Sequence, residues 1–212
     1  MCSHGHNTKF DFIDDSGSLV VFLPGYKRDD NELSFLRDFI VKEKCFSFLY
    51  LPYQLVEGSK ERPIRKIVMK LVEQINIFFA NRKFKSCYLI GYSLGAALAL
   101  DIAVDYPNKF SGLVLISVFD DRRNLLLSRG IRLARENNIS PIRLIKKNKQ
   151  IRTLFIHGVS DKSVAIERAV KVFDESNKKI SKFIPVFGDH YFNDPYSKSL
   201  LNKNINEFLK RP

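Results

Sequence analysis

The stretch CYLIGYSLGAAL at positions 87–98 decides the fold. It begins with an apolar run of strand length and ends in alanines and leucines typical of a helix. Between the two stands the pattern G-x-S-x-G, written here as Gly91-Tyr92-Ser93-Leu94-Gly95. A serine on so sharp a turn has a strained backbone, and its neighbours two positions away must lack bulk. The stretch therefore predicts a nucleophilic serine between a strand and a helix.

The alternation of strand and helix continues on both sides of this stretch. Further apolar runs of strand length lie at 19–23, 46–51, 113–118, 153–156 and 183–187. Apolar residues with helical spacing lie at 33–40, 64–79, 165–173 and 201–209. Pro63 suits the start of the second of these helices, and Asp29 or Asp30 could cap the first. Strands and helices in regular turn predict an α/β fold with a mostly parallel, twisted sheet and helices on both faces.

Length and composition limit the chain to ordinary globular classes. Its 212 residues are 45% hydrophobic and 27% charged, which suffices for one apolar core, so we expect a single domain over 1–212. No apolar run reaches the roughly 18–20 residues of a membrane helix, and the polar N-terminal stretch does not resemble a secretory signal. Cys2, Cys45 and Cys87 form neither an even framework nor a CxxC pair, so no disulfide scaffold or metal site is expected, and the cytoplasm is the expected location.

Two other strand ends supply partners for the serine. A serine hydroxyl needs a base to activate it and a third group to orient that base. The run LFIHGVSD ends at Asp161, and the run IPVFGDHYF places His190 just beyond the last expected strand. Because the carboxyl ends of parallel strands meet at one edge of the sheet, we expect Ser93, Asp161 and His190 to converge there.

These motifs, together with their order along the chain, resemble the α/β-hydrolase superfamily. The resemblance is to its small esterases, thioesterases and carboxylesterases, and extends over about residues 19–209. It implies that Ser93 is the nucleophile, that His190 acts as general base and then as acid, and that Asp161 orients the imidazole. The function so implied is that of a serine hydrolase, which cleaves a carboxylic ester or thioester through an acyl-serine intermediate without a metal or an organic cofactor.

The same resemblance implies a site for the oxyanion and contacts for the substrate. The backbone amides of Leu94 and Tyr26 would form the oxyanion hole. Many relatives have His-Gly before the second of these amides, whereas this chain has Pro24-Gly25. Tyr92 and Tyr191, which adjoin the nucleophile and the histidine, are expected to contact the substrate.

Rival residues exist for the acid and the base. Asp120 and Asp121 also follow a strand and are alternatives to Asp161. His157 ends a strand beside a glycine, and we expect it to be a hydrogen-bonded structural residue. Asp189 directly precedes His190, which makes it a poor orienting group.

The segment 119–150 interrupts the alternation where this family often carries a lid, and we expect a short helical insertion there. Leu127, Ile131 and Ala134 fit one helix face, and Arg129, Arg132 and Arg135 fit another. Residues 120–152 contain ten basic and three acidic side chains, a net charge of +7 within the chain's +12. The cluster is either a solvated helix face or a patch that attracts an anionic substrate, such as an acyl-CoA or a phospholipid surface.

Other functions remain open at this point. The same scaffold hosts acyltransferases and lyases, and a non-catalytic ligand-binding module could retain the motifs. A nucleic-acid partner is not expected, because the basic residues are spread along the chain and none of the usual recognition motifs is present. The acyl chain, the leaving group, the oligomeric state and peripheral contact with a membrane are not decided by the sequence.

Overall fold

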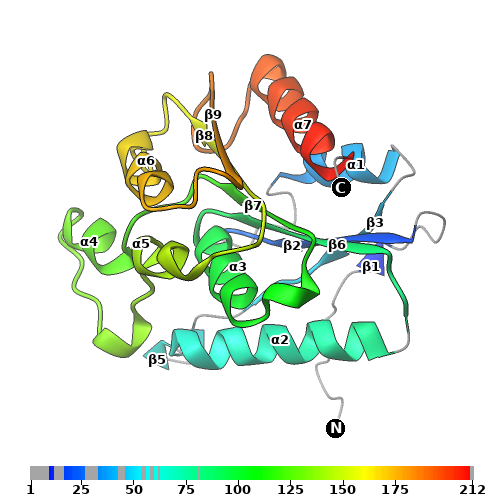
Figure 1. Cartoon of the computed structure of the whole chain (residues 1–212). Coiled ribbons are helices and arrows are strands. Elements are labelled where there is room, and N and C mark those ends of the chain that lie inside the picture. The colour runs from blue at the N-terminus through cyan, green and yellow to red at the C-terminus, as the bar shows by residue number, and fades with distance from the viewer. Residues whose placement is uncertain are drawn as a thin grey trace, which may run out of the picture.

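A seven-stranded sheet forms the centre of the structure (Figure 1). This computed structural model describes residues 10–11, 17–26, 33–42, 46–53, 56–57, 60–61, 63–80 and 82–210. The strand order is β1-β3-β2-β6-β7-β8-β9, and all neighbours pair in parallel except β1, which is antiparallel to β3. The strands are β1 (Phe10–Asp11), β2 (Ser18–Leu23), β3 (Ser47–Tyr50), β6 (Ser86–Tyr92), β7 (Gly112–Ile116), β8 (Thr153–Gly158) and β9 (Ser181–Val186). The predicted α/β fold is confirmed.

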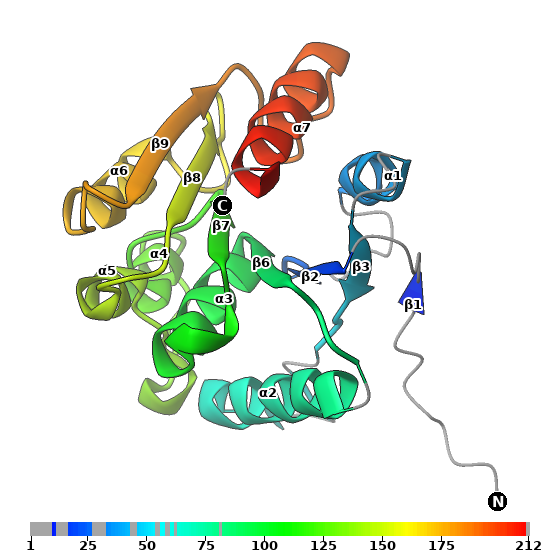
Figure 2. The same cartoon turned by 45° about the vertical axis from the view of Figure 1, so that its right-hand side comes forward.

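Helices cover both faces of the sheet (Figure 2). One face packs against α1 (Ser34–Lys42) and α7 (Pro195–Lys210), and the other against α2 (Ile64–Ala80), α3 (Leu94–Asp105) and α6 (Ile166–Asp174). The shorter helices are α4 (Arg122–Leu127), α5 (Pro141–Leu144) and 3-10 turns at Pro107–Lys109, Arg135–Asn137 and Ile145–Lys147. A separate ribbon pairs β4 (Val56–Glu57) with β5 (Lys60–Glu61). Asp29 and Asp30, the predicted caps of α1, lie outside the described residues.

The central strands have no polar face because both of their faces are covered. Along β7, Leu113 and Leu115 point into the core beneath α2 and α3, whereas Val114 and Ile116 point into the core beneath α1 and α7. A parallel strand buried on both sides appears in the sequence as a continuous apolar run. Each large aliphatic side chain buried in this way contributes about 1.5–3 kcal/mol to folding.

The expected single helix through Leu127, Ile131 and Ala134 is wrong. α4 ends at Leu127, because Gly130 adopts a left-handed φ of 75° and closes the helix. The Gly130 amide donates to the Leu127 carbonyl (3.0 Å), and the Ile131 amide donates to the Leu126 carbonyl (2.9 Å). These two hydrogen bonds form a Schellman cap. As a result, Leu127 and Ile131 are about half exposed, at 47% and 50%.

The arginines of this segment do not share a helix face either. Arg129 and Arg132 follow the end of α4, whereas Arg135 begins a separate 3-10 turn. The segment 119–150 is thus a series of short helices and 3-10 turns, with α5 packed against α3 and α6.

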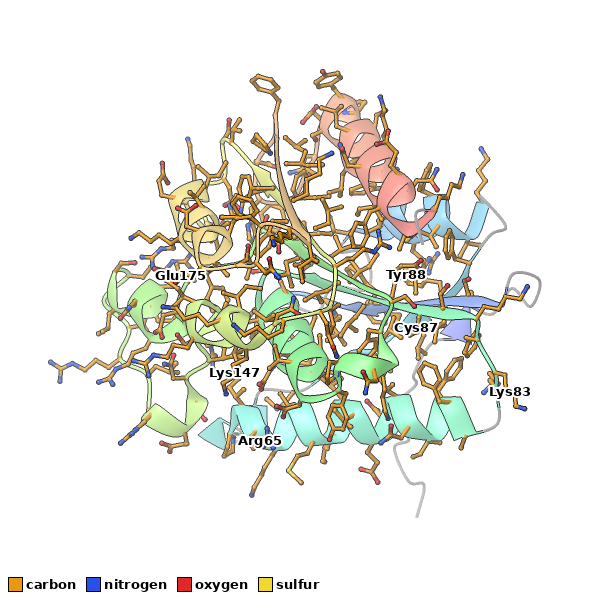
Figure 3. All side chains as sticks on the ribbon, in the orientation of Figure 1. Arg65, Lys83, Cys87, Tyr88, Lys147 and Glu175 are labelled. Carbon is orange, nitrogen blue, oxygen red and sulfur yellow. The ribbon has the colours of Figure 1, made fainter. Side chains whose placement is uncertain are left out.

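The cysteine on β6 has a structural position. Cys87, labelled in Figure 3, belongs to the core beneath α2 and α3, with only 4% of its surface exposed. Burial raises the pKa of the Cys87 thiol, which keeps it protonated and unreactive. Cys2 and Cys45 lie outside the described residues.

Candidate active site

Ser93 occupies the turn between β6 and α3 in a strained backbone conformation. Its φ of 54° and ψ of −114° lie outside the regions that most residues adopt. The Ser93 amide donates to the Ile116 carbonyl at 2.8 Å, which fixes the turn to the end of β7. Strain at such a turn presents the side chain at the edge of the sheet instead of burying it. The Ser93 hydroxyl makes no hydrogen bond with the residues that the structure describes.

The two glycines of the motif are required by contact with backbone. A Cβ atom on Gly91 would lie 2.4 Å from the Gly95 carbonyl oxygen. A Cβ atom on Gly95 would lie 2.2 Å from the Leu23 carbonyl oxygen and 2.3 Å from that of Pro24. Backbone atoms cannot move away as a flexible side chain can, so α3 begins directly against the end of β2.

Replacement of Gly95 by alanine is expected to destabilise the protein by about 3 kcal/mol, because the added methyl group overlaps two carbonyl groups. Gly130→Ala is the matched control: its Cβ would meet nothing within 4 Å, so only the left-handed backbone opposes it, at about 1 kcal/mol. Urea unfolding of both variants measures the difference. Equal losses would mean that the contact at Gly95 does not constrain the turn.

Asp161 and His190 are joined by a short hydrogen bond at the same edge of the sheet. His190 Nδ1 lies 2.6 Å from Asp161 Oδ2, and both residues are buried, at 8% and 6% exposure. Asp161 follows β8 and His190 follows β9, and these strands are neighbours. Because the carboxylate only accepts, Nδ1 carries the proton and Nε2 is left as the free basic nitrogen of the ring.

The Asp161 carboxylate accepts hydrogen bonds on both oxygens. The amides of Ser163 and Val164 donate to Oδ1, each at 2.8 Å. His157 Nε2 lies 3.4 Å from Oδ2 and donates to the Val164 carbonyl at 2.8 Å. Burial alone would raise the pKa of Asp161, but the nearby His157 ring and the hydrogen bond from His190 hold that pKa well below its usual range. The carboxylate therefore remains ionised at neutral pH.

The rival carboxylates are engaged elsewhere. Asp120 accepts from the Arg168 guanidinium at 2.7 Å, and Asp121 caps α4 by accepting from the Asn124 amide at 3.2 Å. Asp189 accepts from the Tyr191 amide and from the Asn193 side chain within its own loop. The structure thus brings His190 to Asp161 and not to these three residues.

Tyr92 has a different position from the one expected. Its side chain is fully buried, so it does not face a substrate. The Tyr92 hydroxyl donates to the His190 carbonyl at 2.9 Å, and the two rings lie 5.1 Å apart. Tyr92 belongs to the core beneath α1 and α7, whereas Leu94 belongs to the core beneath α2 and α3. Sequence spacing alone did not indicate this support of the histidine.

Tyr92→Phe is expected to lower kcat about fivefold with little change in KM, because the His190 loop loses one buried hydrogen bond of about 1 kcal/mol. Tyr88→Phe on the same strand is the control, since the Tyr88 hydroxyl has no hydrogen-bond partner among the described residues. Steady-state kinetics on a soluble ester measures both. A rise in KM with unchanged kcat would instead place Tyr92 at the substrate.

The two backbone amides predicted to bind the oxyanion belong to Leu94 and Tyr26. Leu94 is the first residue of α3, where amides have no partner within the helix, and the helix dipole favours negative charge. Tyr26 follows the end of β2, which pairs with β6 through Leu23 and Gly91. The Tyr53 hydroxyl donates to the Pro24 carbonyl at 2.8 Å and so supports this loop.

The remaining expected substrate contact lies beside the histidine. Tyr191 is 41% exposed, and its ring stands edge-on to the His190 ring at 5.3 Å. A cavity of about 300 Å³ lies elsewhere, at the amino ends of β8 and β9, where Thr153 and Ser181 line it. Because the strand ends that carry Ser93, Asp161 and His190 are at the opposite edge, this cavity is separate from the candidate active site.

A family model matches most of the chain. The model described as Serine hydrolase (FSH1) matches residues 25–203, which include Ser93, Asp161 and His190. Phytyl ester synthase 2, chloroplastic, from Arabidopsis thaliana is 29% identical over 99 residues, which are 47% of this chain and 13% of that protein. The chain therefore spans only a small part of the length of that curated relative.

Solved structures share the fold over nearly the whole chain. Est1E from Butyrivibrio proteoclasticus has a TM-score of 0.75 at 13% identity, covering 94% of this chain and 91% of its own. The esterase Pf2001 from Pyrococcus furiosus has a TM-score of 0.75 at 18% identity, covering 93% of this chain and 82% of its own. At these identities the likeness establishes the α/β-hydrolase fold.

Proposed function

Because the chain belongs to the family described as Serine hydrolase (FSH1), we propose that it cleaves a carboxylic ester or thioester through an acyl-Ser93 intermediate. The hydrogen bond of 2.6 Å between His190 and the ionised Asp161 carries this proposal. It leaves the other ring nitrogen of His190 free to accept a proton at the edge of the sheet where Ser93 is presented.

In the first half-reaction, His190 Nε2 takes the Ser93 hydroxyl proton while Oγ attacks the acyl carbon. The amides of Leu94 and Tyr26 stabilise the resulting oxyanion, and the imidazolium then gives its proton to the leaving alcohol or thiol. In the second half-reaction, water takes the place of the alcohol or thiol: His190 removes a proton from it, and its oxygen attacks the acyl carbon. The bond to Ser93 Oγ then breaks, Oγ regains a proton from His190, and the carboxylic acid is released. Asp161 remains ionised throughout and stabilises the imidazolium, since its two oxygens accept three hydrogen bonds besides the contact with His157.

The substrate class is supported by the residues around the histidine. Exposed aromatic and aliphatic side chains, among them Tyr191 and Phe187, favour an apolar acyl or aryl group. A solved structure of similar fold, Est1E, contains ferulic acid, a small aromatic acid. The exposed Arg129 and Arg132, on the segment that follows β7, favour an anionic substrate.

Intact mass after treatment with a fluorophosphonate, on wild type and on Ser93→Ala, tests the proposal. A single adduct on wild type alone is the expected result. A panel of 4-nitrophenyl esters and acyl thioesters then separates the two bond types. Folded wild-type protein that binds these compounds without labelling or turnover would support a non-catalytic module instead.

Acyl transfer to an alcohol is the second candidate, favoured by the similarity of 99 residues to a phytyl ester synthase. Product analysis with a long-chain alcohol in the assay distinguishes the two, because a transferase forms the new ester in preference to the free acid. Among the described helices, none combines the length and the apolar character needed to cross a bilayer. Location in the cytoplasm stays a prediction from the sequence.

A further inference from the structure

A second histidine lies beside the acid of the candidate active site. His157 stands near the end of β8, four residues before Asp161, and its side chain is fully buried. The proposed reaction gives it no part. Burial of a polar ring costs free energy unless the ring is hydrogen-bonded, so its contacts have to offset that cost.

The contacts of the His157 ring identify which nitrogen carries the proton. Nε2 lies 2.8 Å from the Val164 carbonyl oxygen, which can only accept, so Nε2 donates. Nδ1 is buried and has no hydrogen-bond partner among the described residues. A second proton on Nδ1 would leave a buried donor unsatisfied. The surroundings therefore favour the neutral ring with its one proton on Nε2.

This donated hydrogen bond completes a closed set of contacts around Asp161. The Val164 carbonyl accepts from His157, and the Val164 amide donates to Asp161 Oδ1 at 2.8 Å. His157 Nε2 also lies 3.4 Å from Asp161 Oδ2. Oδ2 is the oxygen that lies 2.6 Å from His190 Nδ1. One buried N–H group thus reaches both the loop that holds the carboxylate and the carboxylate oxygen that meets the base.

The orientation of the Asp161 carboxylate depends on this loop. The torsion that turns a carboxylate is soft, so its oxygens keep a fixed direction only where donors hold them. The donors to Oδ1 are the amides of Ser163 and Val164, which belong to the loop itself. His157 belongs to β8, which pairs with β7 on one side and β9 on the other. It therefore connects the loop to a rigid part of the sheet.

We propose that His157 is a positioning residue for the active site: its Nε2–H group ties the loop after β8 to the sheet and holds Asp161 in the orientation that meets His190. This inference rests on the proposed function, in which Asp161 orients the imidazole of His190. His157 acts on the reaction only through Asp161. Small freedom in the loop is enough to matter, because a shift of about 1 Å in a catalytic constellation can cost about 10²-fold in rate.

Two variants of similar volume separate the donated hydrogen bond from packing. His157→Gln places an amide N–H near the position of Nε2, whereas His157→Leu fills the space without a donor. In hydrolysis of 4-nitrophenyl acetate, we expect His157→Leu to lower kcat about tenfold with KM changed less than about twofold. His157→Gln should stay within about threefold of the wild-type kcat. Phe155→Leu is the control for stability, because Phe155 is buried on the same strand and packs against Phe173 and Phe183.

The proton between His190 and Asp161 gives a readout that needs no turnover. A proton in so short a hydrogen bond to a carboxylate gives a proton NMR signal far downfield of ordinary amide signals. Asp161→Asn assigns the signal by abolishing it. We expect the signal in wild type, in His157→Gln and in Phe155→Leu, and we expect it to be shifted upfield or lost in His157→Leu.

Three results would overturn the proposal. They are an unchanged downfield signal in His157→Leu, a kcat in His157→Gln as low as in His157→Leu, and an equal loss of kcat in Phe155→Leu at matched stability in urea. Failure of the proposed function has a different signature: wild type would show the downfield signal but neither react with the fluorophosphonate nor hydrolyse esters. The NMR comparison of His157→Leu with His157→Gln would still decide whether His157 positions Asp161.

Discussion

Ser93→Ala is expected to lower kcat for ester hydrolysis by a factor of about 10⁴ or more, while the protein remains folded. The hydroxyl is the attacking group, and the oxyanion-binding amides alone supply only a small residual rate. Stability should change little, because the Ser93 hydroxyl makes no hydrogen bond with the described part of the chain. Single-turnover kinetics together with urea unfolding measures both quantities.

Ser117→Ala is the matched control for this variant. Ser117 also follows a strand, has a φ of 51°, and its buried hydroxyl has no hydrogen-bond partner among the residues whose positions are described. The control should retain activity. Residual hydrolysis by Ser93→Ala at more than about a tenth of the wild-type rate, with Ser117→Ala unchanged, would exclude an acyl-serine mechanism.

Asp161→Asn is expected to reduce kcat by about 10⁴-fold, because the amide donates to His190 and reverses the protonation of the ring nitrogens. His190 would then present a protonated nitrogen to Ser93 and could not accept its proton. Asp121→Asn is the control, since Asp121 follows the preceding strand and caps α4. The pH profile of kcat/KM measures both, and a loss of similar size in Asp121→Asn would move the acid to that earlier strand.

The same substitution should alter stability in acid in a defined direction. The pKa of Asp161 is lower in the folded protein than in the unfolded chain, so folding favours its ionised form. Its contribution is complete above the unfolded pKa of about 3.9 and is lost as the pH falls through and below that value. Wild type should therefore lose more stability than Asp161→Asn between about pH 5 and pH 2, measured by urea unfolding at each pH.

Much of the fold follows from local sequence. The continuous apolar runs predict β2, β3, β6, β7 and β8, because parallel strands covered on both faces leave no polar alternation. The run at 183–187 predicts β9, an edge strand that is only partly buried. The helical spacing over 64–79 predicts α2 in the same way. The match to a serine hydrolase family confirms the predicted superfamily and type of enzyme.

Features that depend on the third dimension were not predictable in this way. A helical spacing continued past Leu127, but a single glycine in a left-handed conformation ended α4 there. Tyr92 adjoins the nucleophile in sequence, but its ring is directed into the core, where it supports the His190 loop. His157 was expected to be structural, and only the geometry brings its ring to within 3.4 Å of Asp161.

The contact of Gly91 and Gly95 with backbone atoms has an evolutionary consequence. A descendant of this chain that replaces either glycine loses stability, whether or not it retains an activity, because the atoms that a Cβ would meet belong to the backbone. The hydroxyl of Ser93 is under no such constraint, since no hydrogen bond within the described ranges depends on it. Among homologues, we therefore expect the two glycines to be retained wherever the fold is retained, and the serine between them to be retained only where the activity is selected.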